Sequence, residues 1–133
     1  MSISTLLSAD ERDRKPTVID ETHLQRMTLG DRRLEREVLE LFVRQTTIML
    51  NRIMEAEPPL AAAAAHTLKG SARGIGAWRV ARAAERVEHA AGSAGREAAL
   101  TDAVAELKAA SLEASAAIGA RLSALLAELA RGR

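Results

Sequence analysis

The 133-residue chain has the length of one compact domain and leaves no room for a nucleotide-binding lobe beside a single core. Apolar residues make up 47% of it and aromatic residues only 2%, and the prevalence of Ala and Leu predicts an all-α fold because both favour helices over strands. With 19 basic and 18 acidic side chains the net charge is +1, so no extended field of one sign exists and neither nucleic acid nor a membrane is an expected partner.

The sequence also shows no sign of secretion or membrane insertion. It contains no cysteine, which excludes disulfides and thiolate metal sites. The longest apolar run, Leu60 to Ala65, is far shorter than a membrane span, and no basic stretch leads into an apolar core near the N-terminus. A cytoplasmic location is therefore expected.

The first segment, residues 1–18, is predicted to be a flexible leader, because residues 10–15 are all charged and the following proline interrupts any helix. The predicted domain covers residues 19–133. It opens with a short helix that Asp20 caps, with Ile19 packing on Leu24 as a hydrophobic staple. This helix is expected to end near Gly30.

Asp31 is the expected cap of a second helix, which Pro58 and Pro59 close. Its apolar residues recur at helical spacing and predict one buried stripe. The predicted stripe consists of Leu34, Val38, Leu41, Phe42, Ile48, Met49 and Ile53.

A third helix should run from about Pro59 to about Arg73, where Gly74 and Gly76 mark a helix break. A fourth helix is expected over residues 77–91. A long last helix follows, and its length of about 50 Å at 1.5 Å per residue predicts either a bend near its central glycine, position 119, or an overhang beyond its neighbours. Short connections between amphipathic helices predict an antiparallel up-down four-helix bundle with a short N-terminal capping helix.

The third helix carries the most informative pattern. At about 100° per residue, its apolar and small residues divide into two faces. The expected core face holds Ala61, Ala64, Leu68, Ala72 and Ile75, and the opposite face holds Ala62, His66, Lys69, Gly70 and Arg73. His66 is therefore predicted to point away from the core.

The neighbours of His66 indicate that another macromolecule approaches it closely. A glycine inside a helix costs roughly 1 kcal/mol relative to alanine, so Gly70 is unexpected in a chain that otherwise uses alanine freely. Ala62 and Ala63 keep the surface low on the preceding turn. Gly70, Ala62 and Ala63 are thus predicted to give a partner access to the imidazole.

A neutral imidazole is a competent nucleophile near pH 7. A phosphoryl group added to its ring would need positive charge nearby, and Lys69 and Arg73 lie one and two turns along the same face. If the third and fourth helices fold back around residue 77, His66 lies level with Glu88, and Lys69 with Glu85. Glu88 is then predicted to accept a proton from the inner ring nitrogen and to orient the imidazole.

The run His66, Lys69, Gly70 and Gly76 resembles the His-x-x-Lys-Gly-x5-Gly signature of the histidine phosphotransfer domains of bacterial phosphorelays. The resemblance extends from about Ile19 to about Ala91. It implies that His66 carries a phosphoryl group on its outer nitrogen, while Lys69 and Gly70 assist the phosphate charge and partner access. Members of this family often carry Gln or Glu at the offset of Glu88.

The resemblance also implies a phosphocarrier rather than an enzyme, without ATP binding or autokinase activity. It implies that the partners are receiver domains of hybrid histidine kinases and response regulators, which supply the acidic pocket, Mg²⁺ and the acceptor Asp. No metal or cofactor is expected on this chain, and a monomer is expected.

Two other interpretations remain open. One is a non-catalytic helical adaptor bundle that binds partner helices. The other is the phospho-accepting domain of a chemotaxis-type histidine kinase, which Glu88 makes conceivable. His23 and His89 have no accompanying motif and are predicted to be surface residues, and Trp78 is predicted to pack in the bundle.

Overall fold

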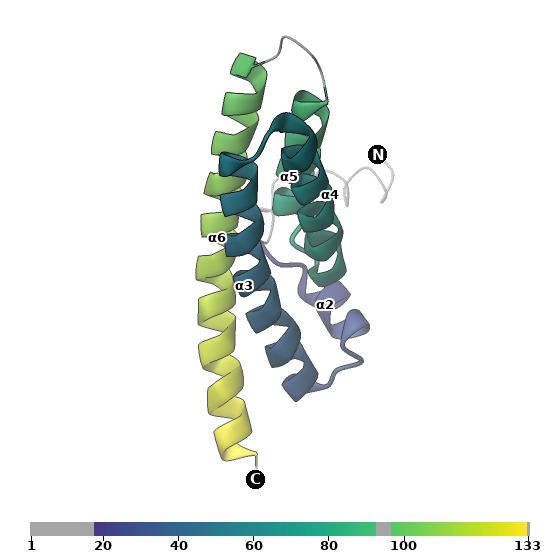
Figure 1. Ribbon diagram of the computed structural model, residues 1–133. Helices are drawn as coiled ribbons and strands as arrows, with labels where there is room; N and C mark the ends of the chain where they lie inside the picture. Colours follow the sequence, from purple (N-terminus) through teal and green to yellow (C-terminus); the bar gives the residue numbers. More distant parts are fainter. Residues whose placement is uncertain (1–17, 93–96, 133) are drawn as a thin grey trace, which may run out of the picture.

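The computed structural model describes residues 18–92 and 97–132 (Figure 1). These ranges contain no strand and comprise the helices α2 (Glu21–Met27), α3 (Arg32–Glu55), α4 (Pro58–Ile75), α5 (Trp78–Ala91) and α6 (Glu97–Arg131). The all-α prediction is confirmed. Residues 1–17 lie outside the described part, so the division into a leader and a domain stays a prediction.

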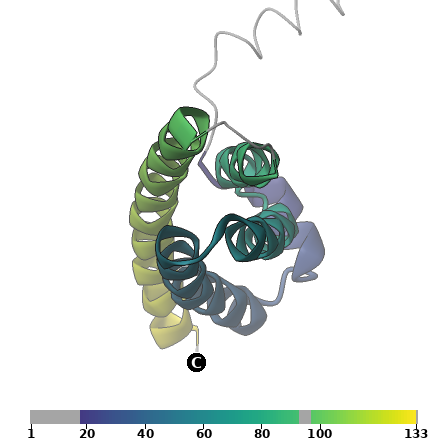
Figure 2. The ribbon, with the colours of Figure 1, turned by 45° about the horizontal axis from the view of Figure 1, so that its top comes forward.

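Helices α3, α4, α5 and α6 share one core of buried side chains, and the tilted view shows the four helices arranged around it (Figure 2). Each of them packs against two others, in the cyclic order α3, α4, α5, α6, and consecutive helices run antiparallel. The short helix α2 contacts α4 at the end of the bundle where α4 finishes. This arrangement agrees with the predicted four-helix bundle with a short N-terminal helix. None of the described helices combines the length and apolar character needed to cross a bilayer.

The predicted helix starts are set by local chemistry. The Asp20 side chain accepts a hydrogen bond from the His23 backbone N–H at 3.0 Å, which caps α2. Asp31 caps α3 in the same way through the first free N–H groups of that helix. Helix α4 begins at Pro58, one residue before the predicted start, because proline tolerates the first helical turn.

The turn between α4 and α5 corrects one prediction. Gly74 lies within the last turn of α4 and does not break it, whereas Gly76 ends the helix with a left-handed φ of 80°. The turn is also tied to the start of α2, since the Asp20 backbone N–H donates to the Gly76 carbonyl at 3.0 Å. Trp78 Nε1 donates to the Asp20 carboxylate at 3.0 Å, so Trp78 packs at this junction and remains partly exposed.

The predicted stripe of α3 is wrong in part, because the helix is rotated about its axis. Leu34, Leu41 and Ile48 of that stripe are exposed, and the buried positions are Glu35, Leu39, Phe42, Thr46 and Ile53. Two of these are polar, and both find partners. The Thr46 hydroxyl donates to the Phe42 carbonyl at 2.7 Å, while the Glu35 carboxylate accepts from Arg121 Nε at 2.6 Å.

Helix α6 is a single unbroken helix of 35 residues. It continues through Gly119 without interruption, and its C-terminal turns extend beyond the start of α3 (Figure 1). Of the two predicted possibilities, the structure therefore has the overhang. The ion pair between Arg121 and Glu35 fixes this part of α6 against α3.

Candidate functional site

His66 lies on the outer face of α4, as the sequence predicts. All five residues assigned to the core face of this helix are buried: Ala61, Ala64, Leu68, Ala72 and Ile75. The His66 side chain is 67% exposed. A macromolecular partner can therefore reach the imidazole without any change in the bundle.

The neighbouring helix α5 supplies a carboxylate that holds the ring. His66 Nδ1 lies 2.7 Å from Glu88 Oε2, and the Lys69 ammonium donates to Glu88 Oε1, also at 2.7 Å. Glu88 is half-buried and Lys69 is largely covered. One carboxylate thus bridges the imidazole and the lysine, and it restricts the motion of both side chains.

The protonation of this group follows from its contacts. The hydrogen bond from Lys69 lowers the pKa of Glu88, and the hydrogen bond from His66 adds to this effect against the opposing cost of burial. An ionised carboxylate only accepts hydrogen bonds, so the neutral His66 carries its proton on Nδ1. The lone pair of the neutral ring is then on Nε2, the nitrogen turned away from Glu88.

The pairing of Lys69 differs from the prediction, which placed this residue level with Glu85. Lys69 pairs with Glu88 and not with Glu85, because its flexible side chain reaches back along α4 towards the more buried carboxylate. Glu85 instead lies 3.9 Å from an Arg73 nitrogen, in a loose and exposed pair. Lys69 is therefore the cation that shares a carboxylate with His66, and Arg73 lies farther out.

The glycine and the alanines beside His66 leave open space. A Cβ atom added at Gly70 would meet no atom within 4 Å, so nothing in the described fold requires glycine there. Gly70 and Ala63 are exposed, and Ala62 is half-buried. No long side chain projects from these three positions next to the imidazole, and the sequence predicted this low surface.

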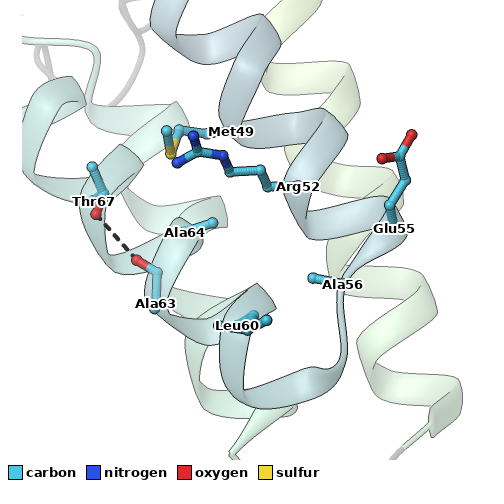
Figure 3. A pocket seen from close by; sticks show the side chains of 8 residues that line it. All are labelled: Met49, Arg52, Glu55, Ala56, Leu60, Ala63, Ala64 and Thr67. Carbon is cyan, nitrogen blue, oxygen red and sulfur yellow. Dashed lines mark hydrogen bonds between the residues drawn. The ribbon is translucent and has the colours of Figure 1, made fainter.

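The structure also contains a cleft that the sequence did not predict. This cleft lies on the α3 side of α4, whereas Glu88 lies on the α5 side. It lies between the C-terminal half of α3 and the N-terminal half of α4, has a volume of about 540 Å³, and is open to solvent (Figure 3). Its lining consists of Met49, Arg52, Glu55, Ala56, Leu60, Ala63, Ala64 and Thr67. The sequence signal that could have indicated it is the run of small residues on α4 opposite a methionine and a long polar side chain on α3.

The two other histidines differ in their surroundings. His23 was predicted as a plain surface residue, but its Nε2 lies 2.8 Å from the Arg73 carbonyl and its ring packs against Trp78 with centroids 4.9 Å apart. It therefore joins α2 to the end of α4. His89 is exposed on α5. Residues 18–92 and 97–132 contain no group of His, Asp and Glu side chains arranged to hold a metal ion.

Comparison with known proteins assigns a family. The family model named Hpt domain matches residues 37–132. The chain belongs to the Hpt domain family. This Hpt domain is thus, in general terms, a histidine phosphocarrier of the phosphorelay type, in a family whose members exchange phosphoryl groups with receiver domains and are not kinases.

A solved structure supports the fold of this Hpt domain. A rice protein described as a histidine-containing phosphotransfer protein superposes with a TM-score of 0.73, at 20% sequence identity, over 92% of this chain and 90% of that chain. No curated protein matches the chain. The family match begins within α3, so α2 lies outside the matched residues, whereas Gly76, to which α2 is joined, lies inside them.

Proposed function

We propose that His66 is the phosphoacceptor of this Hpt domain. It accepts a phosphoryl group from the aspartyl phosphate of a receiver domain in a hybrid histidine kinase and passes it to the Asp of a response regulator. The observation that carries the proposal is the exposed imidazole whose Nδ1 is bound by an ionised carboxylate. His23, by contrast, is half-buried, and its Nε2 lies 2.8 Å from the Arg73 backbone carbonyl.

The transfer step balances on the groups present. The Nε2 lone pair attacks phosphorus, the N–P bond forms, and the P–O bond to the aspartate breaks so that its carboxylate leaves with the electron pair. The proton stays on Nδ1, and the phosphorylated ring becomes a cation that Glu88 stabilises across the 2.7 Å contact. The reverse reaction uses the same arrangement, so His66 both accepts the phosphoryl group and gives it up.

The neighbouring residues take the roles predicted for them. Lys69 has further N–H groups beside the one that donates to Glu88, and these neutralise phosphoryl charge. Arg73 adds positive charge at a greater distance. Gly70, Ala62 and Ala63 leave room for the receiver to bring its aspartyl phosphate into line.

The chain needs no cofactor of its own in this proposal. Mg²⁺ belongs to the receiver domain, where it neutralises charge on the transferring group. The Hpt domain supplies the nucleophile and its orientation, without ATP binding or autokinase activity. We expect it to act as a monomer in the cytoplasm, where one exposed histidine serves successive receivers.

The direct test is phosphoryl transfer from phosphorylated receiver domains of the source organism. Wild type should acquire an acid-labile, base-stable label, and His66→Gln should acquire none. The matched controls His23→Gln and His89→Gln should be labelled like wild type. Label on His66→Gln would exclude this residue as the acceptor, and failure of every receiver to label the wild type would favour an adaptor bundle.

A further inference from the structure

The cleft shown in Figure 3 adjoins the proposed phosphoacceptor. Ala63 lies one turn before His66 on α4, and Thr67 follows it directly, and both line the cleft. Leu60, at the far rim, lies six residues from His66, which corresponds to about 9 Å along the helix. The edge of the cleft that Ala63 and Thr67 form therefore adjoins the face of α4 that carries His66.

A receiver that docks with His66 near the centre of its footprint would also reach this cleft. The reacting atoms have to approach to about 3–3.5 Å. A specific complex buries about 800 Å² on each partner, which corresponds to a disc of roughly 16 Å radius. A footprint of this size centred on His66 would include Ala63 and Thr67 and the cleft that they line.

The cleft also has the character of an anchor site. Its lining includes the small side chains of Ala56, Ala63 and Ala64 and the apolar side chain of Met49, so a partner side chain can enter and lose contact with water. Leu60 is 65% exposed at the rim, which is costly for a leucine in water. Interfaces gain most of their binding free energy where one large side chain fills such a hollow.

The surface on the α5 side of His66 is unsuited to binding an apolar side chain of a partner. There the surface consists of charged side chains that already bind one another, Lys69 with Glu88 and Arg73 with Glu85. Arg52 at the cleft, by contrast, makes no ion pair within the described part of the chain and is exposed. A carboxylate of the partner can pair with it without displacing an internal contact.

We propose that this cleft is the anchor pocket for the receiver domain, which inserts an apolar side chain between α3 and α4 and places a carboxylate against Arg52. The inference rests on the proposed function, because it assigns the partner that delivers or removes the phosphoryl group. It adds a determinant of affinity that is separate from the chemistry at His66.

The test compares cleft variants with matched surface variants. Leu60→Ser and Arg52→Glu alter the cleft, while Leu112→Ser, at a leucine 72% exposed on α6, and Arg82→Glu, at an exposed arginine on α5, make the same chemical changes elsewhere. The probe is a receiver domain that labels the wild type. Its Kd is measured for each variant in a His66→Gln background, and transfer is measured with His66 present.

Each cleft variant should raise the Kd at least tenfold, and each control should leave it within twofold. The lifetime of the isolated phosphohistidine should be equal in all variants, because the cleft does not touch the phosphoryl group. The melting temperature of each variant is measured to check that the fold is retained. Transfer with an unchanged Kd for the cleft variants would overturn the anchor pocket while leaving the proposed function intact, whereas absence of transfer to wild type would overturn both.

Discussion

Replacement of Gly76 by alanine is expected to destabilise the protein strongly. Gly76 ends α4 with φ at 80°, and a Cβ atom there would lie 2.9 Å from the Asp20 Cβ and 3.0 Å from the Asp20 carbonyl oxygen. Both atoms belong to a segment that the hydrogen bond from the Asp20 N–H to the Gly76 carbonyl holds in place. The clash therefore falls on the backbone and not on a movable side-chain end.

The size of the effect follows from two contributions. The left-handed conformation costs alanine about 1–2 kcal/mol, and forced repacking of a tight contact costs about 1–3 kcal/mol. Together they give a loss of about 2–5 kcal/mol in the free energy of unfolding. With about 4 °C per kcal/mol for a domain of this size, the melting temperature should fall by roughly 8–20 °C.

Two other glycines of α4 serve as matched controls. An added Cβ at Gly70 or Gly74 meets nothing within 4 Å, and both lie inside the helix. Alanine is the better helix former by roughly 0.5–1 kcal/mol, so Gly70→Ala and Gly74→Ala should raise the melting temperature by a few degrees.

The assay is thermal and urea unfolding followed by far-ultraviolet circular dichroism for the three variants and the wild type. Opposite signs for Gly76→Ala and the two controls are expected. A Gly76→Ala protein as stable as the wild type would refute the assignment of this glycine to the contact with Asp20. Destabilisation by Gly70→Ala would show that its role is internal packing and would remove it from the partner surface.

Glu88→Gln should slow transfer roughly tenfold, because a neutral amide loses about 1.4 kcal/mol of stabilisation for the phosphorylated ring; an unchanged rate and an unchanged ring tautomer in ¹⁵N NMR would contradict its orienting role. The hydrogen bond from Trp78 lowers the pKa of Asp20 below its ordinary value of 3.8, so the stability that ionised Asp20 contributes is present above that pH and is lost as the pH falls below it. Fluorescence of the single tryptophan should report that acid transition, and Asp20→Asn should abolish its pH dependence. Arg121→Leu leaves Glu35 buried without its main partner and should cost about 3 kcal/mol in urea unfolding, with much of the loss recovered when Glu35→Leu is added; equal stability of the single variant and wild type would show that the pair is dispensable.

The sequence determined the features that depend on near neighbours along the chain. Asp20 and Asp31 cap their helices because a short side chain reaches N–H groups two or three residues ahead. Pro58 starts α4 because its fixed φ suits a first turn. The outward direction of His66 follows from the helical period alone, and so does the buried face of α4.

The tertiary structure decided which distant groups meet. Helix α3 buries Glu35 and exposes Leu41, and the buried carboxylate pairs with Arg121, which lies 86 positions away in the sequence. Lys69 pairs with Glu88 and not with Glu85 because of the way α5 packs against α4. Helical spacing predicts which residues of two neighbouring helices lie level only to within about one turn.

The same reason explains the two features that the sequence did not reveal. The cleft lies between α3 and α4, where small side chains line α4, and the contact of Gly76 with Asp20 forms where the segment before α2 meets the turn after α4. Local preferences act over a few residues of chain, so they specify the helices and the direction of the imidazole. The contact of Glu88 with His66 was predicted from the fold-back of two neighbouring helices, whereas the pairing of Lys69 with Glu88 and the cleft beside α4 depend on packing between helices, which only the folded chain fixes.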